Sequence, residues 1–342
     1  MRRMGWLAGL VLLVTEPAWA GRWTEEDFAS KALRTEPYAM LASSDPASAD
    51  TIIGSVRYYT PAKGDTFLDL ARFYGLGYNE IEQANPGVDP WIPGIKASSV
   101  TLPTAWIIPQ GPHQGVVVNI PEMRLYYFHP RRTQALPQLV TTYPVGLGRD
   151  EWRTPQGKFK ILGKTKNPTW IIPESIREEH IRERGDHRRM IEGGAPDNPL
   201  GKYRLELTMP GYRIHGTDIP WGVGMQVSHG CVRLYPEDIE ALFPIVPIGA
   251  PGEFLYQPVK IGARDGRIYA EVSPDIYRFL PDLYAEAQRL VAELGWQNWV
   301  DPAKLRTAVD TQNGIPTDIT VGDAQLPPAG GGPPVPDRRE LL

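Results

Sequence analysis

The chain reads Ser228-His229-Gly230-Cys231-Val232-Arg233-Leu234, a short way after Tyr212-Arg213-Ile214-His215-Gly216-Thr217. The two segments together hold a thiol, two imidazoles and two guanidinium groups. Tyr212 to His215 is rich in strand-forming residues and is followed by glycine, so we expect a short strand that ends in a turn. Cys231 is the only cysteine of the 342 residues, so it is either a buried spectator or a chemical reagent. Its neighbours favour the reagent.

A thiol is mostly protonated at neutral pH and is then a weak nucleophile, so chemistry at Cys231 needs a nearby base or cation. His215 lies sixteen positions before Cys231, which leaves room for a strand and a return loop. His229 lies two positions before it and would share a face with the thiol in extended backbone. The spacing alone does not choose between the two imidazoles.

Gly230 and Arg233 add two further features to this segment. A glycine beside the nucleophile allows close backbone approach and leaves amide groups free to stabilise an oxyanion, each worth roughly 3 to 4 kcal/mol in the transition state. Arg233 has the forked geometry that pairs with a substrate carboxylate. The alternative for Arg233 is a structural ion pair.

Further strand-forming pieces lie outward from these segments and are separated by Gly and Pro. They are residues 116–120, 124–128, 139–145, 158–162 and 204–207. Their spacing predicts a mainly β catalytic domain over residues 115–260. The charged stretch 173–199 predicts an excursion, and a plain solvated loop is favoured over a lid. A helix is expected from Pro236, with acidic residues in its first turn.

Residues 57–104 predict a small α+β module in the order strand, helix, helix, strand. Thr66 and Asp69 resemble a capping box at the start of the first helix, and Gly75 is its stop signal. A second helix is expected from Asn79 to the Asn85-Pro86 pair. The run from Val100 then predicts the closing strand.

The two ends of the chain are predicted to lie outside these domains. Residues 1–20 carry two arginines, an apolar run and Ala18-Trp19-Ala20, which is the pattern of a signal peptide. The apolar run of residues 4–14 is too short for a membrane anchor, and no later stretch predicts a transmembrane segment. Residues 21–56 predict a linker, and 261–312 a helical C-terminal appendage in which a β pair past Tyr256 precedes a helix from about Asp282 to Leu294. The Pro/Gly-rich residues 313–342 predict a disordered tail.

The composition is that of an ordinary globular protein, with 42% hydrophobic and 22% charged residues. The formal net charge is −4, and no basic stripe is present. Nucleic-acid binding normally needs a concentrated excess of Lys and Arg, so a nucleic-acid partner is not predicted.

The small module resembles a LysM domain through Gly64-Asp65-Thr66, Asn85-Pro86 and the closing Leu102-Pro103. The resemblance covers about 45 residues and implies a module that binds the N-acetylglucosamine-containing glycan of cell walls. The alternative is a spacer without affinity for sugar.

The larger domain resembles the YkuD-type L,D-transpeptidase family. The resemblance rests on His215-Gly216, eleven intervening residues, and Ser228-His229-Gly230-Cys231-Val232-Arg233. It also covers the upstream run Arg153-Thr154-Pro155-Gln156-Gly157-Lys158-Phe159 and the later run Asn198-Pro199-Leu200-Gly201. It implies the sandwich-like β fold of that family over roughly residues 115–260.

The resemblance also implies a reaction and a set of roles. The cysteine attacks the amide before D-alanine in a peptidoglycan tetrapeptide stem, D-alanine leaves, and an amine captures the acyl-enzyme to give a 3→3 crosslink. Cys231 would be the nucleophile, His215 the base, and the Gly216 carbonyl the group that orients the imidazole. The amides of His229, Gly230 and Cys231 would form the oxyanion site, and Ser228 and Arg233 would support substrate or loop. Acylation of Cys231 by carbapenems is a further expectation from the family.

Other readings stay open. The same acyl-enzyme could attach a lipoprotein to peptidoglycan, or water could resolve it as in an L,D-carboxypeptidase. A protein of another class, a non-catalytic LysM wall-binding protein, would keep the small module and lose the chemistry. A periplasmic location in a Gram-negative cell fits an exported chain of this kind best.

The histidines and tryptophans suggest two further kinds of site, a metal site and a substrate groove. His215, His229 and Cys231 could in principle bind zinc, but the spacing is not that of a zinc site and no fourth donor is evident, so no metal and no cofactor are predicted. Trp91, Trp170 and Trp221 are more often packing residues than ligands. We nevertheless expect Trp221, which lies between the two catalytic segments, to line a substrate groove.

Overall fold

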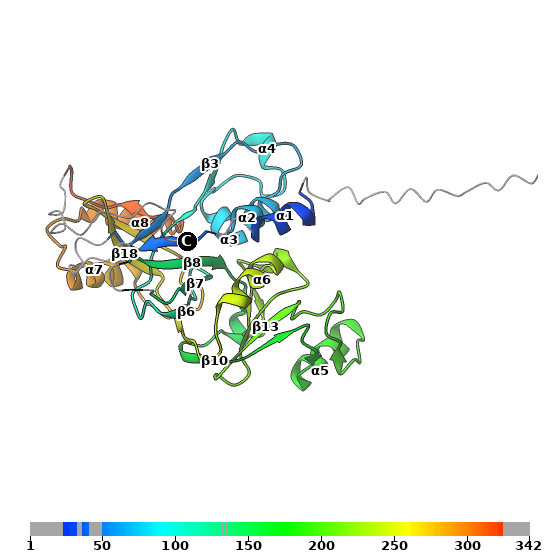
Figure 1. The fold of residues 1–342 in the computed structure, drawn as a ribbon. Coiled ribbons are helices and arrows are strands. Elements are labelled where there is room, and N and C mark those ends of the chain that lie inside the picture. Colours follow the sequence, from blue (N-terminus) through cyan, green and yellow to red (C-terminus); the bar gives the residue numbers. More distant parts are fainter. Residues whose placement is uncertain (1–22, 33–35, 41–49, 132, 134–135, 324–342) are drawn as a thin grey trace, which may run out of the picture.

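The computed structural model describes residues 23–32, 36–40, 50–131, 133 and 136–323 (Figure 1). The predicted signal peptide and residues 324–342 of the predicted tail lie outside these described residues. Within the described residues, no helix is long and apolar enough to span a membrane.

A nine-stranded mixed sheet forms the centre of the larger domain, which confirms the prediction of a strand-rich catalytic domain. Its strands, in spatial order, are β1 (Tyr38–Met40), β8 (Gln138–Pro144), β7 (Arg124–Phe128), β6 (Gly115–Asn119), β17 (Pro251–Leu255), β10 (Gly157–Lys166), β13 (Tyr203–Leu207), β14 (Arg213–His215) and β16 (Val232–Arg233). β17 runs parallel to β6, and β14 runs parallel to β16. The two halves of the sheet share the long strand β10, which has a register shift between Ile161 and Gly163.

Strand β7 is buried along its whole length because both faces of the sheet are covered here. Leu125 and Tyr127 point into the core of the catalytic domain, which helix α6 (Pro236–Ile245) also enters. Tyr126 and Phe128 point the other way, into the core of the small module. One strand therefore serves two hydrophobic cores.

The small module contains β3 (Arg57–Tyr59), α2 (Phe67–Tyr74), α3 (Tyr78–Gln83), α4 (Pro93–Lys96) and β4 (Val100–Leu102), with β3 antiparallel to β4. The predicted caps of the first helix are confirmed: Thr66 accepts a hydrogen bond from the Asp69 amide, and Gly75 adopts a left-handed φ of 71°. The second helix starts one residue before the predicted Asn79. Its N-cap is Gly77, because the Glu80 carboxylate accepts from the Gly77 amide.

Residues 21–56, predicted as a linker, contain regular structure in their described part. They form helix α1 (Glu25–Ala32), strand β1 on the edge of the main sheet, and β2 (Ile52–Gly54), which pairs with β5 (Ala105–Ile107). Phe28 and Ile53 are buried, and Glu25 pairs with Arg72 of α2. These few apolar contacts and the ion pair have no sequence periodicity, which is why the segment resembled a linker.

The C-terminal part contains the β pair and the helix predicted for the appendage, together with a third strand and a second helix. Helices α7 (Leu283–Glu293) and α8 (Pro302–Thr311) pack on a three-stranded sheet of β18 (Val259–Arg264), β19 (Arg267–Val272) and β20 (Thr317–Asp318). The predicted tail from residue 313 begins too early, since Ile319 is fully buried in this core. A single apolar side chain near Pro and Gly was too weak a signal to predict that this segment folds.

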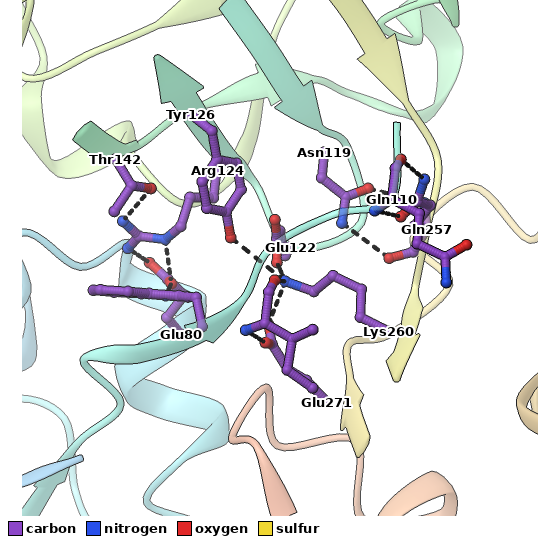
Figure 2. Close-up of polar contacts among 12 residues, drawn as sticks. Glu80, Gln110, Asn119, Glu122, Arg124, Tyr126, Thr142, Gln257, Lys260 and Glu271 are labelled. Carbon is purple, nitrogen blue, oxygen red and sulfur yellow. Dashed lines mark hydrogen bonds and ion pairs between the residues drawn. The ribbon is translucent and has the colours of Figure 1, made fainter. Parts of the chain in front are cut away.

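Buried charges join the three parts of the molecule (Figure 2). Lys260 of β18 contacts Glu122 near β7, lies 2.8 Å from Glu271 of β19, and donates to the Ile107 carbonyl of β5 at 2.7 Å. The Glu271 carboxylate in turn accepts from the Ile107 amide. Lys260 thus lies between two buried carboxylates, although Glu122 Oε1 has no hydrogen-bond partner among the described residues.

The excursion 173–199 is not a plain loop. It contains the eleven-residue helix α5 (Glu174–Arg184), which ends at Gly185 in a left-handed conformation, and β12 (Met190–Ile191), which pairs with β11 (Trp170–Ile171). Its small core of Ile172, Ile176 and Ile191 explains why this charged stretch folds. In Figure 1, α5 projects from the end of the catalytic domain away from the C-terminal part.

Candidate active site

The two predicted catalytic segments form neighbouring parallel strands at the edge of the main sheet. In their register, Ile214 of β14 lies opposite Val232 of β16, and His215 lies opposite Arg233. Cys231 directly precedes β16, and its side chain lines the same cavity as those of His215 and Arg233. The topology thus brings the thiol and the imidazole together.

A cavity of about 770 Å³ opens on this side of the sheet. Its lining includes all five side chains that carry the predicted chemistry, namely His215, Ser228, His229, Cys231 and Arg233. The volume is in the range of small-ligand sites and would admit a peptide segment.

His215 has a defined tautomer in this setting. Its side chain is only 2% exposed, and Nδ1 lies 2.7 Å from the Gly216 carbonyl oxygen. Because a carbonyl only accepts hydrogen bonds, Nδ1 carries the proton and Nε2 keeps its lone pair. Burial lowers the pKa of His215 to about 3, and the positive charge of Arg233 acts in the same direction. The imidazole is therefore neutral at physiological pH.

Cys231 is held as a thiol rather than a thiolate. Its Sγ lies 3.8 Å from the Gly211 carbonyl oxygen. Burial raises the pKa of Cys231, while the nearby Arg213 and Arg233 act in the opposite direction. The thiol and the imidazole are both neutral. Cys231 therefore becomes a strong nucleophile only when its proton passes to a base, such as the unprotonated Nε2 of His215.

The turn before the thiol depends on Gly230. Its φ of 99° is in the left-handed region, and a Cβ there would lie 2.8 Å from the Tyr212 ring, so only glycine fits. The Gly230 amide, predicted as an oxyanion donor, donates to Ser228 Oγ at 3.1 Å. Ser228 Oγ donates in turn to the Cys231 carbonyl at 2.6 Å. Ser228 therefore braces the turn, and the Gly230 amide is already used.

His229 is held by two charged residues that the sequence did not single out. Its Nε2 lies 2.8 Å from a carboxylate oxygen of Glu179 in α5 and 2.6 Å from a guanidinium nitrogen of Arg149. Hydrogen bonds from Arg149 and from His229 lower the pKa of Glu179 to about 2. The excursion is thereby tied to the wall of the cavity through His229.

Two residues hold neighbouring segments of the site in place, and both belong to the runs that resemble the L,D-transpeptidase family. Thr154 Oγ1 donates to the Gly230 carbonyl at 3.0 Å, and the Thr154 amide donates to the hydroxyl of Tyr277 at 3.1 Å. Asn198 donates to the carbonyls of Pro168 and Glu192 and so closes the base of the excursion. Tyr277, which belongs to the segment after the predicted catalytic domain, gave no signal in the sequence.

Arg233 and Asp218 are two of five cavity residues with a buried side-chain atom that lacks a hydrogen-bond partner among the described residues; the others are Arg149, His180 and Arg204. Among the described residues, the buried Arg233 Nε and Asp218 Oδ1 have no hydrogen-bond partner. Burial lowers the pKa of Arg233 and raises that of Asp218, while each charge opposes the shift of the other. A buried donor atom and a buried acceptor atom thus lack partners in two described residues of the cavity lining.

The substrate groove predicted at Trp221 stays a prediction, since Trp221 lies outside the cavity that contains Cys231. Trp221 lies in η3 (Pro220–Gly222), is 57% exposed, and is not among the described residues that line the cavity. Trp152 and Trp170 line it instead. His180 of α5 also lines the cavity and is buried. Among the described residues, no three His, Cys, Asp or Glu side chains are placed to hold a metal ion.

Comparison with known proteins agrees with the geometry. The family profile of the L,D-transpeptidase catalytic domain (YkuD) matches residues 113–261. The Escherichia coli protein "Probable L,D-transpeptidase YcfS" is 31% identical over 288 residues, which cover 80% of this chain and 87% of that protein. "Probable L,D-transpeptidase YbiS" of the same organism is 37% identical over 232 residues, which cover 66% of this chain and 73% of that protein.

Proposed function

Because the chain belongs to the YkuD family of L,D-transpeptidases, we propose that it acts on peptidoglycan stem peptides through an acyl-enzyme on Cys231. The observation that carries this proposal is that Cys231 and His215 line one cavity of about 770 Å³, on neighbouring segments of the sheet. The hydrogen bond from His215 Nδ1 to the Gly216 carbonyl adds the orientation that a general base needs.

The first half of the reaction transfers the acyl group to the enzyme. Nε2 of His215 takes the thiol proton as Sγ attacks the carbonyl before D-alanine in a tetrapeptide stem. The C–N bond then breaks, the proton passes from His215 to the leaving amine, and a thioester and free D-alanine result. A neutral starting pair suits this step, because no ion pair has to be desolvated when substrate enters.

The second half regenerates the thiol. An amine from another stem loses a proton to His215 and attacks the thioester, and Sγ leaves with that proton as Cys231 is restored. With a stem amine as acceptor the product is a 3→3 crosslink. The same thioester would serve a lipoprotein lysine or water, so the acceptor is a separate question for the product analysis below.

The choice of His215 over His229 as base rests on their partners. His229 Nε2 is occupied by Glu179 and Arg149, whereas His215 uses only Nδ1 and keeps Nε2 free. We assign His229 to positioning the excursion. The oxyanion would then be met by the His229 and Cys231 amides, with Arg233 directed at a substrate carboxylate.

The small module and the N-terminus complete the proposal. We propose that residues 57–104 act as a LysM module and hold the glycan, while residues 1–20 export the chain to the periplasm. The paired β3 and β4 with α2 and α3 between them support the first assignment.

The decisive experiment is mass spectrometry of the mature protein incubated with a disaccharide-tetrapeptide. We expect an adduct on Cys231 with release of D-alanine. The adduct should disappear in Cys231→Ala, and its formation should be slowed more in His215→Ala than in His229→Ala. Absence of both adduct and D-alanine from well-folded wild-type protein would favour the wall-binding alternative, and the products formed would identify the acceptor.

A further inference from the structure

The turn between α2 and α3 of the small module contacts the loop that connects His215 to Cys231. The Tyr78 amide donates to the Val223 carbonyl at 3.2 Å, and the Asn79 amide donates to the Gly224 carbonyl at 3.3 Å. Both donors belong to the first turn of α3, whose amides have no partner within the helix. The catalytic loop therefore caps a helix of the small module.

The two backbones meet without space for a side chain. A Cβ on Gly77 would lie 2.7 Å from the Cα of Gly224, and a Cβ on Gly224 would lie 2.4 Å from the Cα of Gly77. Gly224 also has a φ of 83°, and its amide donates to the Val145 carbonyl at 3.2 Å. Gly224 is thus fixed from the small module on one side and from the catalytic domain on the other.

The small module also holds the chain after the thiol. The Tyr235 hydroxyl donates to the Leu76 carbonyl at 3.2 Å. Arg72 of α2 donates to both carboxylate oxygens of Glu237, at 3.1 and 3.0 Å, in a buried pair. Contacts with the module thus occur seven residues before Cys231, at Gly224, and four residues after it, at Tyr235.

Arg124 of the main sheet fixes the orientation of the turn (Figure 2). Its fully buried guanidinium donates to both Glu80 oxygens, at 3.0 and 2.7 Å, and to the Gly75 carbonyl at 2.9 Å. It also lies 4.1 Å from the Trp106 ring centre. Since Glu80 accepts from the Gly77 amide as well, the turn, the helix and the sheet form one hydrogen-bonded unit.

We propose that the turn of residues 75–79 is a positioning element of the active site, and that the small module sets the placement of Cys231 against His215 independently of any glycan it binds. Gly77 is the positioning residue at the centre of this contact. This positioning role depends on the proposed transpeptidase function only where it is tested by turnover; the alkylation measurement does not depend on that function.

The test compares two glycine substitutions of similar steric severity. In Gly77→Ala the new Cβ meets Gly224 of the catalytic domain at 2.7 Å, and in Gly94→Ala it meets the Ala62 carbonyl, inside the small module, at 2.8 Å. Neither glycine has a left-handed φ. Each variant is assayed for turnover of a tetrapeptide without sugar, for the pH profile of Cys231 alkylation by iodoacetamide, and for its melting temperature.

We expect Gly77→Ala to lower kcat on the sugar-free peptide about tenfold or more, with KM within about twofold, because small misplacements of reacting groups carry large rate penalties. The alkylation profile should shift relative to wild type. Gly94→Ala should leave both unchanged. Equal kcat and equal alkylation profiles in the two variants would overturn the proposal and leave the module as a tether.

A substitute variant and a second readout cover the cases in which Gly77→Ala does not fold or the wild type releases no D-alanine. If Gly77→Ala does not fold, Tyr235→Phe replaces it, since the loss of one hydroxyl preserves packing; a severalfold loss of kcat supports the proposal, and unchanged turnover overturns it. If wild type is alkylated but releases no D-alanine, the proposed function fails, whereas the alkylation profiles still decide the positioning role.

Discussion

Acidification should destabilise this protein through His215, and the size of the effect follows from its burial. The pKa of the imidazole is about 3 in the folded protein and about 6.5 in an unfolded chain. Between these values the unfolded state binds one more proton than the folded state, so stability is fully present above pH 6.5 and is lost as the pH falls toward 3.

The magnitude is about 1.4 kcal/mol for each pH unit in this window. From pH 7 to pH 4.5 the loss due to His215 is about 2.6 kcal/mol, and it changes little if the folded pKa is one unit higher. We choose pH 4.5 for that reason. Other titrating groups add their own effects, so a comparison with a variant that cannot titrate at this position is required.

The assay is urea unfolding of wild type and His215→Gln at pH 7 and pH 4.5. Glutamine keeps an amide donor for the Gly216 carbonyl but takes up no proton. The free energy of unfolding of wild type should fall by about 2.6 kcal/mol more than that of the variant. Equal losses in the two proteins would show that the imidazole is solvated in the folded state, and the neutral-pair mechanism would then lose its basis.

Three further outcomes follow from the structure. Gly230→Ala should lower turnover at least tenfold. Gly249 has a similar positive φ, but a Cβ there would have no atom within 4 Å, so Gly249→Ala should not lower turnover. The same turnover assay on both variants checks this. Glu179→Gln should weaken the hold on His229 and raise KM more than it lowers kcat in steady-state kinetics. Ile319→Ala should cost about 2 to 5 kcal/mol in urea unfolding without changing turnover at 25 °C, and a normal unfolding midpoint would mean that the C-terminal core tolerates the cavity.

Local signals in the sequence predicted the local parts of the fold. The strand at residues 124–128 and the helix bounded by Thr66 and Gly75 occur as expected, because propensity and capping act between near neighbours. The motif around Cys231 and His215 likewise identified the residues that the topology brings together.

Sequence reasoning missed one contact that acts over a long distance in the chain and one that acts between near neighbours. Glu179 lies fifty residues from His229 and sits in a charged run, which alone predicts a solvated surface. The role predicted for the Gly230 amide differed because a nearby hydroxyl, that of Ser228, competes for it. Trp221 was placed by its position between two motifs, and the short η3 turn directs it to solvent.

Strand β7 has a consequence for anyone who cuts this chain at the boundaries of its catalytic domain. A fragment of residues 113–261 would keep the strand but lose the module that covers Tyr126, Phe128 and the neighbouring Val117. These side chains would form a contiguous apolar patch on a sheet, which promotes self-association. Such a fragment should collect in inclusion bodies, while the full-length mature chain should remain in the clarified lysate.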